Sequence, residues 1–153
     1  MKGGGLTVVG GMNRIGLHSD IARRRLRILL VDDERMVLRA MRRLVLARHP
    51  DWDVLCARSG DEALRLLEAY EPVDVIVTDL RMPGLDGIIL LSIISDRFPG
   101  TARIVHSAHV EAYDRDTLSE LCYRVLSKPA GAAELVSTLE CACATAQKAS
   151  IAG

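Results

Sequence analysis

Five short, mostly apolar runs alternate with segments of helical periodicity, and this alternation limits the possible folds more than any other feature. The first run, Ile28–Val31, contains no polar residue, which is typical of a strand buried on both faces. The other runs comprise residues 54–57, 73–77, 102–105 and 123–126. Strands and helices that alternate in this way predict an α/β fold, with helices covering both faces of one parallel sheet.

Residues typical of helix ends support this assignment of alternating strands and helices. Ser59 and Glu62 have the spacing of a capping box, in which each side chain can satisfy a free backbone N–H. Asp86 can cap a further helix, which we expect to run from Gly87 to Arg97 and to stop before Pro99. The other helices are predicted in the region from residue 37 that Pro50 closes, and at residues 63–70, 111–121 and 132–148.

The length of 153 residues fits one domain with short extensions. We expect this domain at residues 26–149, a flexible glycine-containing tail at residues 1–25, and a C-terminal tail at residues 150–153. No run approaches the roughly 20 apolar residues that span a bilayer, and the N-terminal residues lack the pattern of a signal peptide. We therefore expect a cytoplasmic protein that does not contact membranes.

Charge and cysteine content exclude some classes of function. Twenty basic residues balance twenty acidic ones, which leaves no net positive charge for nucleic-acid binding. One stretch is locally basic, and we interpret it as a solvated flank, with contact to an anionic group as the alternative: Arg23, Arg24, Arg25 and Arg27. The four cysteines have no metal-type spacing and are expected to be free thiols: Cys56, Cys122, Cys141 and Cys143.

Polar side chains follow four of the five predicted strands. They are the pair Asp32 and Asp33, then Asp79, Ser107 and Lys128. In a parallel sheet the carboxyl ends of the strands meet at one edge, where ligands bind, so these side chains are expected to converge. Three converging carboxylates repel one another unless they share a cation, and a ligand set of oxygens suits Mg²⁺.

The residue types at this edge favour phosphoryl transfer. Asp79 ends the central apolar run and is the best candidate nucleophile, because a carboxylate can attack a phosphoryl group. Such transfer depends on positioning and on neutralisation of charge. Mg²⁺ on Asp32 and Asp33 would neutralise one side of the group, Lys128 another, and Ser107 would donate a hydrogen bond.

These motifs resemble the receiver domains of bacterial response regulators. The similar segments are VDDE at residues 31–34, VTDLRMPGLDG at residues 77–87, Ser107-Ala108 and Ser127-Lys128-Pro129. They extend over residues 27 to about 147. The RMPG and LSKP segments look most like receivers attached to HD-GYP-type cyclic-di-GMP phosphodiesterases, although we expect no such output domain here.

The resemblance implies several properties of the chain. It implies a flavodoxin-like (βα)5 doubly wound sheet with strand order 2-1-3-4-5, and a cis peptide bond before Pro129. It also implies Mg²⁺ binding by Asp32, Asp33, Asp79 and the backbone carbonyl of Arg81. Finally, it implies phosphorylation of Asp79 by a histidine kinase or a histidine phosphotransfer protein.

The sequence differs from this family mainly near the expected output face. Ser107 replaces the commoner threonine but keeps its hydroxyl, and Val125 stands where many relatives carry a Tyr or Phe. The stretch Ser119–Cys122 lacks the usual glycine, and Ala130 replaces a common aromatic. These differences fall on the face that the fourth helix and fifth strand usually form for output, whereas the phosphorylation motif is complete.

The leading hypothesis is a single-domain response regulator that signals through phosphorylation-dependent binding of an output protein. We expect no enzymatic activity beyond self-phosphorylation from a phosphodonor and slow autodephosphorylation, and no DNA-binding output. One alternative is a receiver-like binding module that works without phosphorylation. Another is a phosphatase of the haloacid dehalogenase type, but that class requires a second Asp where this chain has Arg81.

Overall fold

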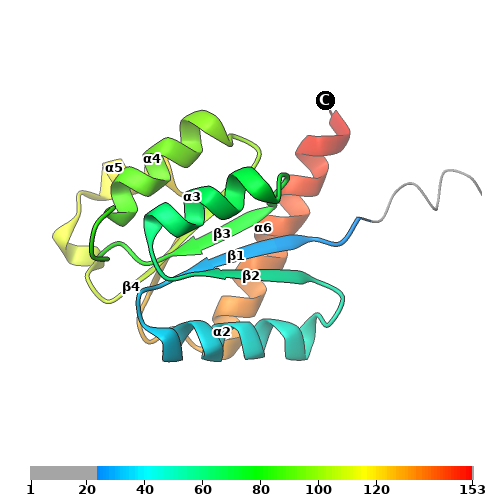
Figure 1. Cartoon of the computed structure of the whole chain (residues 1–153), viewed down its shortest axis with the longest axis horizontal. Coiled ribbons are helices and arrows are strands. Elements are labelled where there is room, and N and C mark those ends of the chain that lie inside the picture. Colours follow the sequence, from blue (N-terminus) through cyan, green and yellow to red (C-terminus); the bar gives the residue numbers. More distant parts are fainter. Residues whose placement is uncertain (1–23, 153) are drawn as a thin grey trace, which may run out of the picture.

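The computed structural model describes residues 24–152 (Figure 1). Most of the predicted tail at residues 1–25, including Arg23, lies outside the described residues. The elements in chain order are β1 (Arg27–Val31), α2 (Arg35–Arg48), β2 (Asp53–Ala57), α3 (Gly60–Ala69), β3 (Val75–Thr78), α4 (Gly87–Arg97), β4 (Ala102–Ser107), a 3₁₀ turn (Val110–Ala112), α5 (Arg115–Leu121), β5 (Arg124–Ser127) and α6 (Ala132–Ala152).

The five strands form one parallel sheet in the order β2-β1-β3-β4-β5. This order confirms the predicted doubly wound, flavodoxin-like fold. The register aligns the ends of the strands: Val31 pairs with Ala57 and Thr78, and Ser107 pairs with Ser127. Residues that follow the strands therefore meet at one edge of the sheet, as the sequence predicted.

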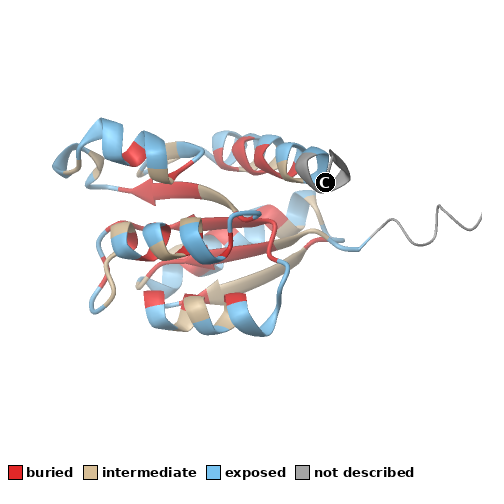
Figure 2. Ribbon diagram, turned by 90° about the horizontal axis from the view of Figure 1, so that it is seen from above, coloured by how far each residue is buried: buried red, intermediate tan, exposed pale blue. Residues whose placement is uncertain are grey.

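Helices cover both faces of the sheet. Figure 1 shows α3, α4 and α5 on one face, with α2 and α6 on the other. In Figure 2 the buried residues line the surfaces where these helices meet the strands. Alternate residues of β1 point to opposite sides, since Leu30 packs in the cluster with α2 and α6, whereas Leu29 packs in the cluster with α3 and α4.

Helix capping agrees with the sequence in part. The Ser59 hydroxyl accepts a hydrogen bond from the Glu62 N–H at 3.1 Å. The Glu62 carboxylate accepts from the N–H of Arg58 at 2.7 Å rather than from that of Ser59, so the reciprocal bond of the capping box is shifted by one residue. Asp86 caps α4 by accepting from the Ile88 N–H at 2.8 Å, as predicted, and α4 has the predicted bounds.

Two helix predictions need correction. The segment predicted as one helix over residues 111–121 is divided, because Asp114 caps a new helix by accepting from the Thr117 N–H at 2.9 Å. The last helix continues to Ala152, beyond the predicted end at residue 148. The boundary drawn after residue 149 therefore falls within α6.

Two arginines of the basic stretch, Arg24 and Arg27, pair with carboxylates, so the interpretation of the stretch as a solvated flank is wrong for these two, whereas Arg25 is exposed. Arg24 forms a two-pronged ion pair with Asp74, with distances of 2.9 and 2.6 Å. Arg27 pairs with Asp53 at 2.7 Å and donates to the carbonyl of Tyr70. Asp74 is buried and also accepts from the Arg27 N–H at 2.8 Å, so these contacts fix the start of β1 beside the start of β3.

Candidate functional site

The predicted acidic residues lie together at the carboxyl edge of the sheet. Asp32, Asp33 and Asp79 each offer a carboxylate oxygen, and the three oxygens lie within 4.8 Å of one another. Asp32 and Asp79 are buried, whereas Asp33 is half-buried. Backbone hydrogen bonds set their positions, since the Asp79 N–H donates to the Val31 carbonyl and the Asp32 N–H to the Ala57 carbonyl.

Lys128 supplies a positive charge inside this cluster. Its Nζ lies 2.6 Å from Asp32 Oδ2 and 2.8 Å from Asp79 Oδ2. Burial works against the charge on Lys128, but the hydrogen bonds to Asp32 and Asp79 outweigh it and raise the pKa of the ammonium above its ordinary value. Lys128 is therefore a permanent cation that spans from β5 to the ends of β1 and β3.

Asp79 is held as an ionised carboxylate. Burial alone would raise the pKa of its carboxyl group, but hydrogen bonds from Lys128 and Ser107 outweigh this effect and lower the pKa below its ordinary value. Its Oδ1 also accepts from the N–H groups of Leu80 at 2.7 Å and Arg81 at 3.3 Å. The side chain thus carries the negative charge that a nucleophilic carboxylate needs at neutral pH.

The start of α4 lies against the backbone of Asp79. The Gly87 N–H donates to the Leu80 carbonyl at 2.9 Å. A Cβ atom at Gly87 would lie only 2.2 Å from the Asp79 carbonyl oxygen, so this position requires glycine. Between Asp79 and Gly87 the chain turns, and Gly84 in this turn has a φ of +80°, in the left-handed region that favours glycine. The RMPGLDG segment therefore fixes where Asp79 stands.

Ser107 and Lys128 reach the site from adjacent strand ends. The Lys128 N–H donates to the Ser107 carbonyl at 3.0 Å, and the Lys128–Pro129 bond is cis, as the resemblance implied. Ser107 is fully buried, and its hydroxyl accepts from the His109 N–H at 3.2 Å. This hydroxyl is near enough to Asp79 to lower the pKa of that carboxyl group.

The cluster fits a magnesium ion. Its ligand atoms are carboxylate oxygens, the donors that Mg²⁺ prefers, and one such oxygen from each of the three residues lies within 4.8 Å of the other two. Asp33 is the outermost of the three and lies open enough for water ligands to complete the shell. The Arg81 N–H contacts Asp79, which places Arg81 beside the cluster, and its carbonyl remains a proposed ligand.

Sequence reasoning did not single out Arg58 and assigned no role to His106, and both residues lie in this region. Arg58 directly follows β2, and its Nη2 lies 3.5 Å from the carbonyl oxygen of Asp33. The signal was present, because Arg58 is a polar residue directly after the second strand, the one strand whose end contributed no residue to the predicted site. His106 is buried next to Ser107. Burial, and to a lesser extent the positive charge of Lys128, lower the pKa of its imidazole. Its Nδ1 has no hydrogen-bond partner among the described residues.

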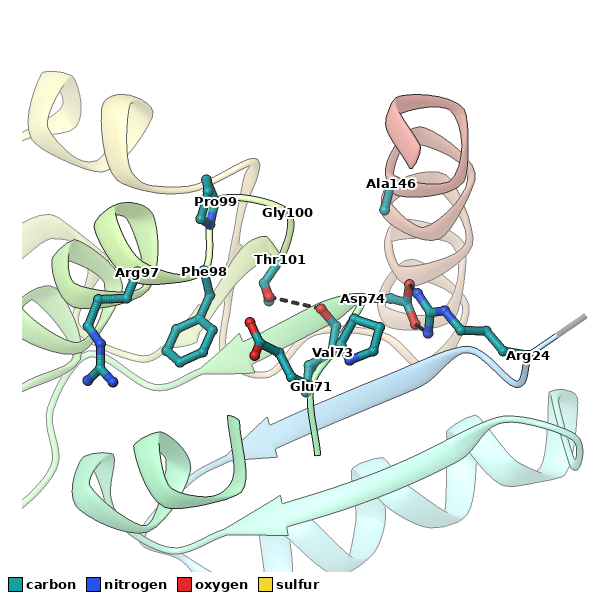
Figure 3. A pocket seen from close by; sticks show the side chains of 11 residues that line it. Arg24, Glu71, Val73, Asp74, Arg97, Phe98, Pro99, Gly100, Thr101 and Ala146 are labelled. Carbon is teal, nitrogen blue, oxygen red and sulfur yellow. Dashed lines mark hydrogen bonds and ion pairs between the residues drawn. The ribbon is translucent and has the colours of Figure 1, made fainter. Parts of the chain in front are cut away.

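A hollow lies at the amino edge of the sheet, opposite the edge that carries the acidic cluster (Figure 3). It has a volume of about 370 Å³ and lies between the loops that precede β3 and β4 and the helix α6. Figure 3 shows two pairs among its lining residues: Asp74 with Arg24, and the Thr101 hydroxyl with the Val73 carbonyl. These contacts hold the fold together, and we assign no ligand to this hollow.

Comparison with known proteins agrees with the geometry of the cluster. Residues 28–140 match the family described as the response regulator receiver domain. The chain is 32% identical over 120 residues to the uncharacterized transcriptional regulatory protein YesN of Bacillus subtilis strain 168, covering 74% of this chain and 31% of that protein. It is 34% identical over 116 residues to the positive alginate biosynthesis regulatory protein of Pseudomonas aeruginosa, covering 74% of this chain and 45% of that protein.

Solved structures give the same assignment. The signal receiver domain of an HD domain-containing protein from Pseudomonas fluorescens Pf-5 is 31% identical, with a TM-score of 0.73 over 82% of this chain and 99% of that chain. This neighbour fits the predicted likeness to HD-GYP-associated receivers. The chain spans less than half the length of the two curated relatives, so the likeness concerns their receiver portions. Among the described residues, no helix is both long and apolar enough to cross a membrane. The chain belongs to the response regulator receiver domain family of two-component systems.

Proposed function

We propose that this chain is a single-domain response regulator that accepts a phosphoryl group on Asp79 and then binds an output protein. The observation that carries the proposal is the ionised Asp79 carboxylate, held 2.8 Å from the ammonium of Lys128 and beside two further carboxylates. The phosphodonor would be the phosphohistidine of a sensor kinase or a phosphotransfer protein, in the cytoplasm. We propose no other catalytic activity.

The proposed reaction is an in-line displacement at phosphorus. An Asp79 oxygen forms a bond to phosphorus while the bond from phosphorus to the donor nitrogen breaks, and its electron pair leaves with the histidine. Lys128 neutralises charge on the phosphoryl oxygens, because its ammonium already lies within hydrogen-bonding distance of Asp79 Oδ2. Ser107 donates its hydroxyl hydrogen to another phosphoryl oxygen.

Asp32, Asp33, Asp79 and the Arg81 carbonyl would hold Mg²⁺. When bound, the ion supplies positive charge that offsets the three carboxylates and the incoming phosphoryl group. Lys128 orients Asp79 through Oδ2, and the Leu80 and Arg81 N–H groups donate to Oδ1. The attacking oxygen is therefore kept in place by the protein itself.

Asp79→Asn tests the phosphorylation site. Acetyl phosphate with Mg²⁺ is expected to add one phosphoryl group to the parent chain and none to the variant, because an amide is not a nucleophile toward phosphorus. Intact mass spectrometry measures the product directly. Asp86→Asn serves as a control, since Asp86 caps α4 outside the cluster and should leave the site phosphorylated. A variant at Asp79 that is labelled as readily as the parent would show that this assignment is wrong.

Asp33→Asn tests the role of the acidic cluster in magnesium binding. Mg²⁺ should raise the melting temperature of the parent by binding only the folded chain, and this rise should nearly vanish in the variant. Without Mg²⁺ the variant should be more stable by about 0.5 kcal/mol, because one repelling charge is removed. Amide chemical shifts near Asp32 report binding directly, whereas the fluorescence of Trp52 should respond weakly, because Trp52 precedes β2 at the opposite edge of the sheet. Equal stabilisation of both proteins by Mg²⁺ would contradict the assignment.

A second candidate function is a binding module that acts without phosphorylation. It is favoured by Val125, which is half-buried in an apolar cluster with Tyr113 and Leu118. A β-branched side chain has few χ1 rotamers, so Val125 is poorly suited to large rotamer changes on phosphorylation. Binding of the output protein by Asp79→Asn as tightly as by the phosphorylated parent would favour this candidate.

A further inference from the structure

Arg58 places a guanidinium group beside the acidic cluster. It is the first residue after β2, and its neighbour Ala57 accepts the hydrogen bond from the Asp32 N–H. Its own N–H is fixed by the Glu62 carboxylate at 2.7 Å, which sets the direction in which the side chain leaves the backbone. The guanidinium then folds over the end of β1, with Nη2 3.5 Å from the Asp33 carbonyl oxygen.

This guanidinium has no ion-pair partner of its own. Arg58 is exposed, and among the residues that the structure describes no carboxylate lies within 4.0 Å of its guanidinium. The exposed Arg97, by contrast, is paired with Glu68. A guanidinium that contacts the Asp33 backbone carbonyl and has no ion-pair partner is attracted by the three carboxylates and can turn toward a ligand bound there.

The net charge of the phosphorylated site favours an additional cationic group such as the Arg58 guanidinium. Three carboxylates and the Lys128 ammonium give two excess negative charges, which Mg²⁺ would cancel. A phosphoryl group on Asp79 then brings about −1.5 to −2 of charge in place of the single carboxylate charge. The phosphorylated site therefore carries uncompensated negative charge, and Arg58 lies on the side of the cluster opposite Lys128.

The spacing of the strands allows the Arg58 guanidinium to reach a phosphoryl group on Asp79. Neighbouring strands lie about 4.8 Å apart, so β2 is about 10 Å from β3 across β1. The guanidinium at the Asp33 carbonyl already spans the first of these two intervals. Phosphoryl oxygens project outward from Asp79, and a planar guanidinium can bind two of them at once.

We propose that Arg58 is a specificity-determining residue of the phosphorylation site, which binds the outer oxygens of the phosphoryl group and of an anionic phosphodonor. Its charge also opposes the binding of Mg²⁺ to the empty cluster. This inference rests on the proposed phosphorylation of Asp79. It extends that proposal, because the end of every strand of the sheet then contributes at least one group to the site.

Arg58→Gln should change the affinities for Mg²⁺ and for beryllofluoride in opposite directions. Without a phosphodonor, Mg²⁺ should bind about 2- to 3-fold more tightly than to the parent, because a nearby positive charge is gone. At saturating Mg²⁺, beryllofluoride, a phosphoryl mimic, should bind about 10-fold more weakly, because a charge-assisted contact is lost. Both affinities can be measured by NMR titration of the amides at the cluster. Arg58→Lys should recover part of the beryllofluoride affinity.

The matched control is Arg65→Gln, which removes the same charge from an exposed position of α3. It should leave both affinities within about 1.5-fold of the parent, as expected for a screened surface charge. If Arg58→Gln weakens Mg²⁺ and beryllofluoride binding together, Arg58 merely supports the Asp33 loop and the proposal is overturned. Unchanged affinities overturn it as well. A parent chain that binds no beryllofluoride overturns the proposed function and, with it, this inference.

Discussion

Lys128→Met will slow phosphorylation of Asp79 by at least about 100-fold, the loss expected when one preorganised charged donor is removed from a transfer site. It will also destabilise the Mg²⁺-free protein by about 3 kcal/mol, because two buried carboxylates lose the cation between them. The side chains of Asp32 and Asp79 are only 1% and 9% exposed, so water cannot replace the ammonium. Mg²⁺ should restore more stability to the variant than it gives to the parent.

The stability difference between parent and Lys128→Met depends on pH in a defined direction. The pKa of Asp79 is lowered from its ordinary value of 3.8, so its contribution is present above that value and is lost as pH falls through the lowered pKa. The pKa of Lys128 is raised from 10.5, so its contribution is complete below that value and is lost as pH rises through the raised pKa. The difference should therefore be constant between about pH 5 and pH 9 and shrink in stronger acid.

Urea denaturation of the two proteins across this pH range measures the difference. Lys148→Met is the matched control, because Lys148 is exposed on α6 and should change the free energy of unfolding by less than about 0.5 kcal/mol. Equal unfolding free energies for the parent and Lys128→Met would mean that the buried ion pair contributes nothing to stability. A normal phosphorylation rate in the variant would remove Lys128 from the proposed mechanism.

The sequence was sufficient to predict the fold and the members of the acidic cluster. Runs such as Ile28–Val31 mark buried parallel strands, and the residue after such a run must lie at the carboxyl edge. Asp32, Asp79 and Lys128 are far apart in the chain, yet each follows a strand, so the alternation alone brought them together. Strand limits were within two residues of those observed.

Contacts that depend on side-chain direction could not be predicted in the same way. The Arg24–Asp74 pair joins residues 50 positions apart, and nothing periodic in the sequence links them. Arg58 was overlooked because a single arginine after a strand is usually a solvated loop residue. The break before α5 was missed because its polar residues fit a continuous helix, although Asp114 and Thr117 have the spacing of a capping pair.

Gly87→Ala will destabilise the chain by about 3 kcal/mol or more, because the added methyl group meets backbone that cannot move away cheaply. The new Cβ would lie 2.2 Å from the Asp79 carbonyl oxygen and 2.7 Å from the Leu80 Cα. Any relief must separate the start of α4 from the end of β3, which carries the proposed nucleophile. The protein that remains folded should therefore also be phosphorylated more slowly by acetyl phosphate.

Two other glycines make this prediction specific. At Gly100 an added Cβ meets nothing within 4 Å, so Gly100→Ala should change the free energy of unfolding by less than about 0.5 kcal/mol. At Gly60 it would lie 2.8 Å from the Cβ and Cδ2 atoms of Leu85; the Cδ2 can turn aside, whereas the Cβ moves only with the loop backbone, so an intermediate loss is expected. Chemical denaturation of the three variants should give the order Gly87, Gly60, Gly100 from largest loss to smallest. If Gly87→Ala were as harmless as Gly100→Ala, α4 would not press against Asp79, and the RMPGLDG segment would not be what positions the carboxylate.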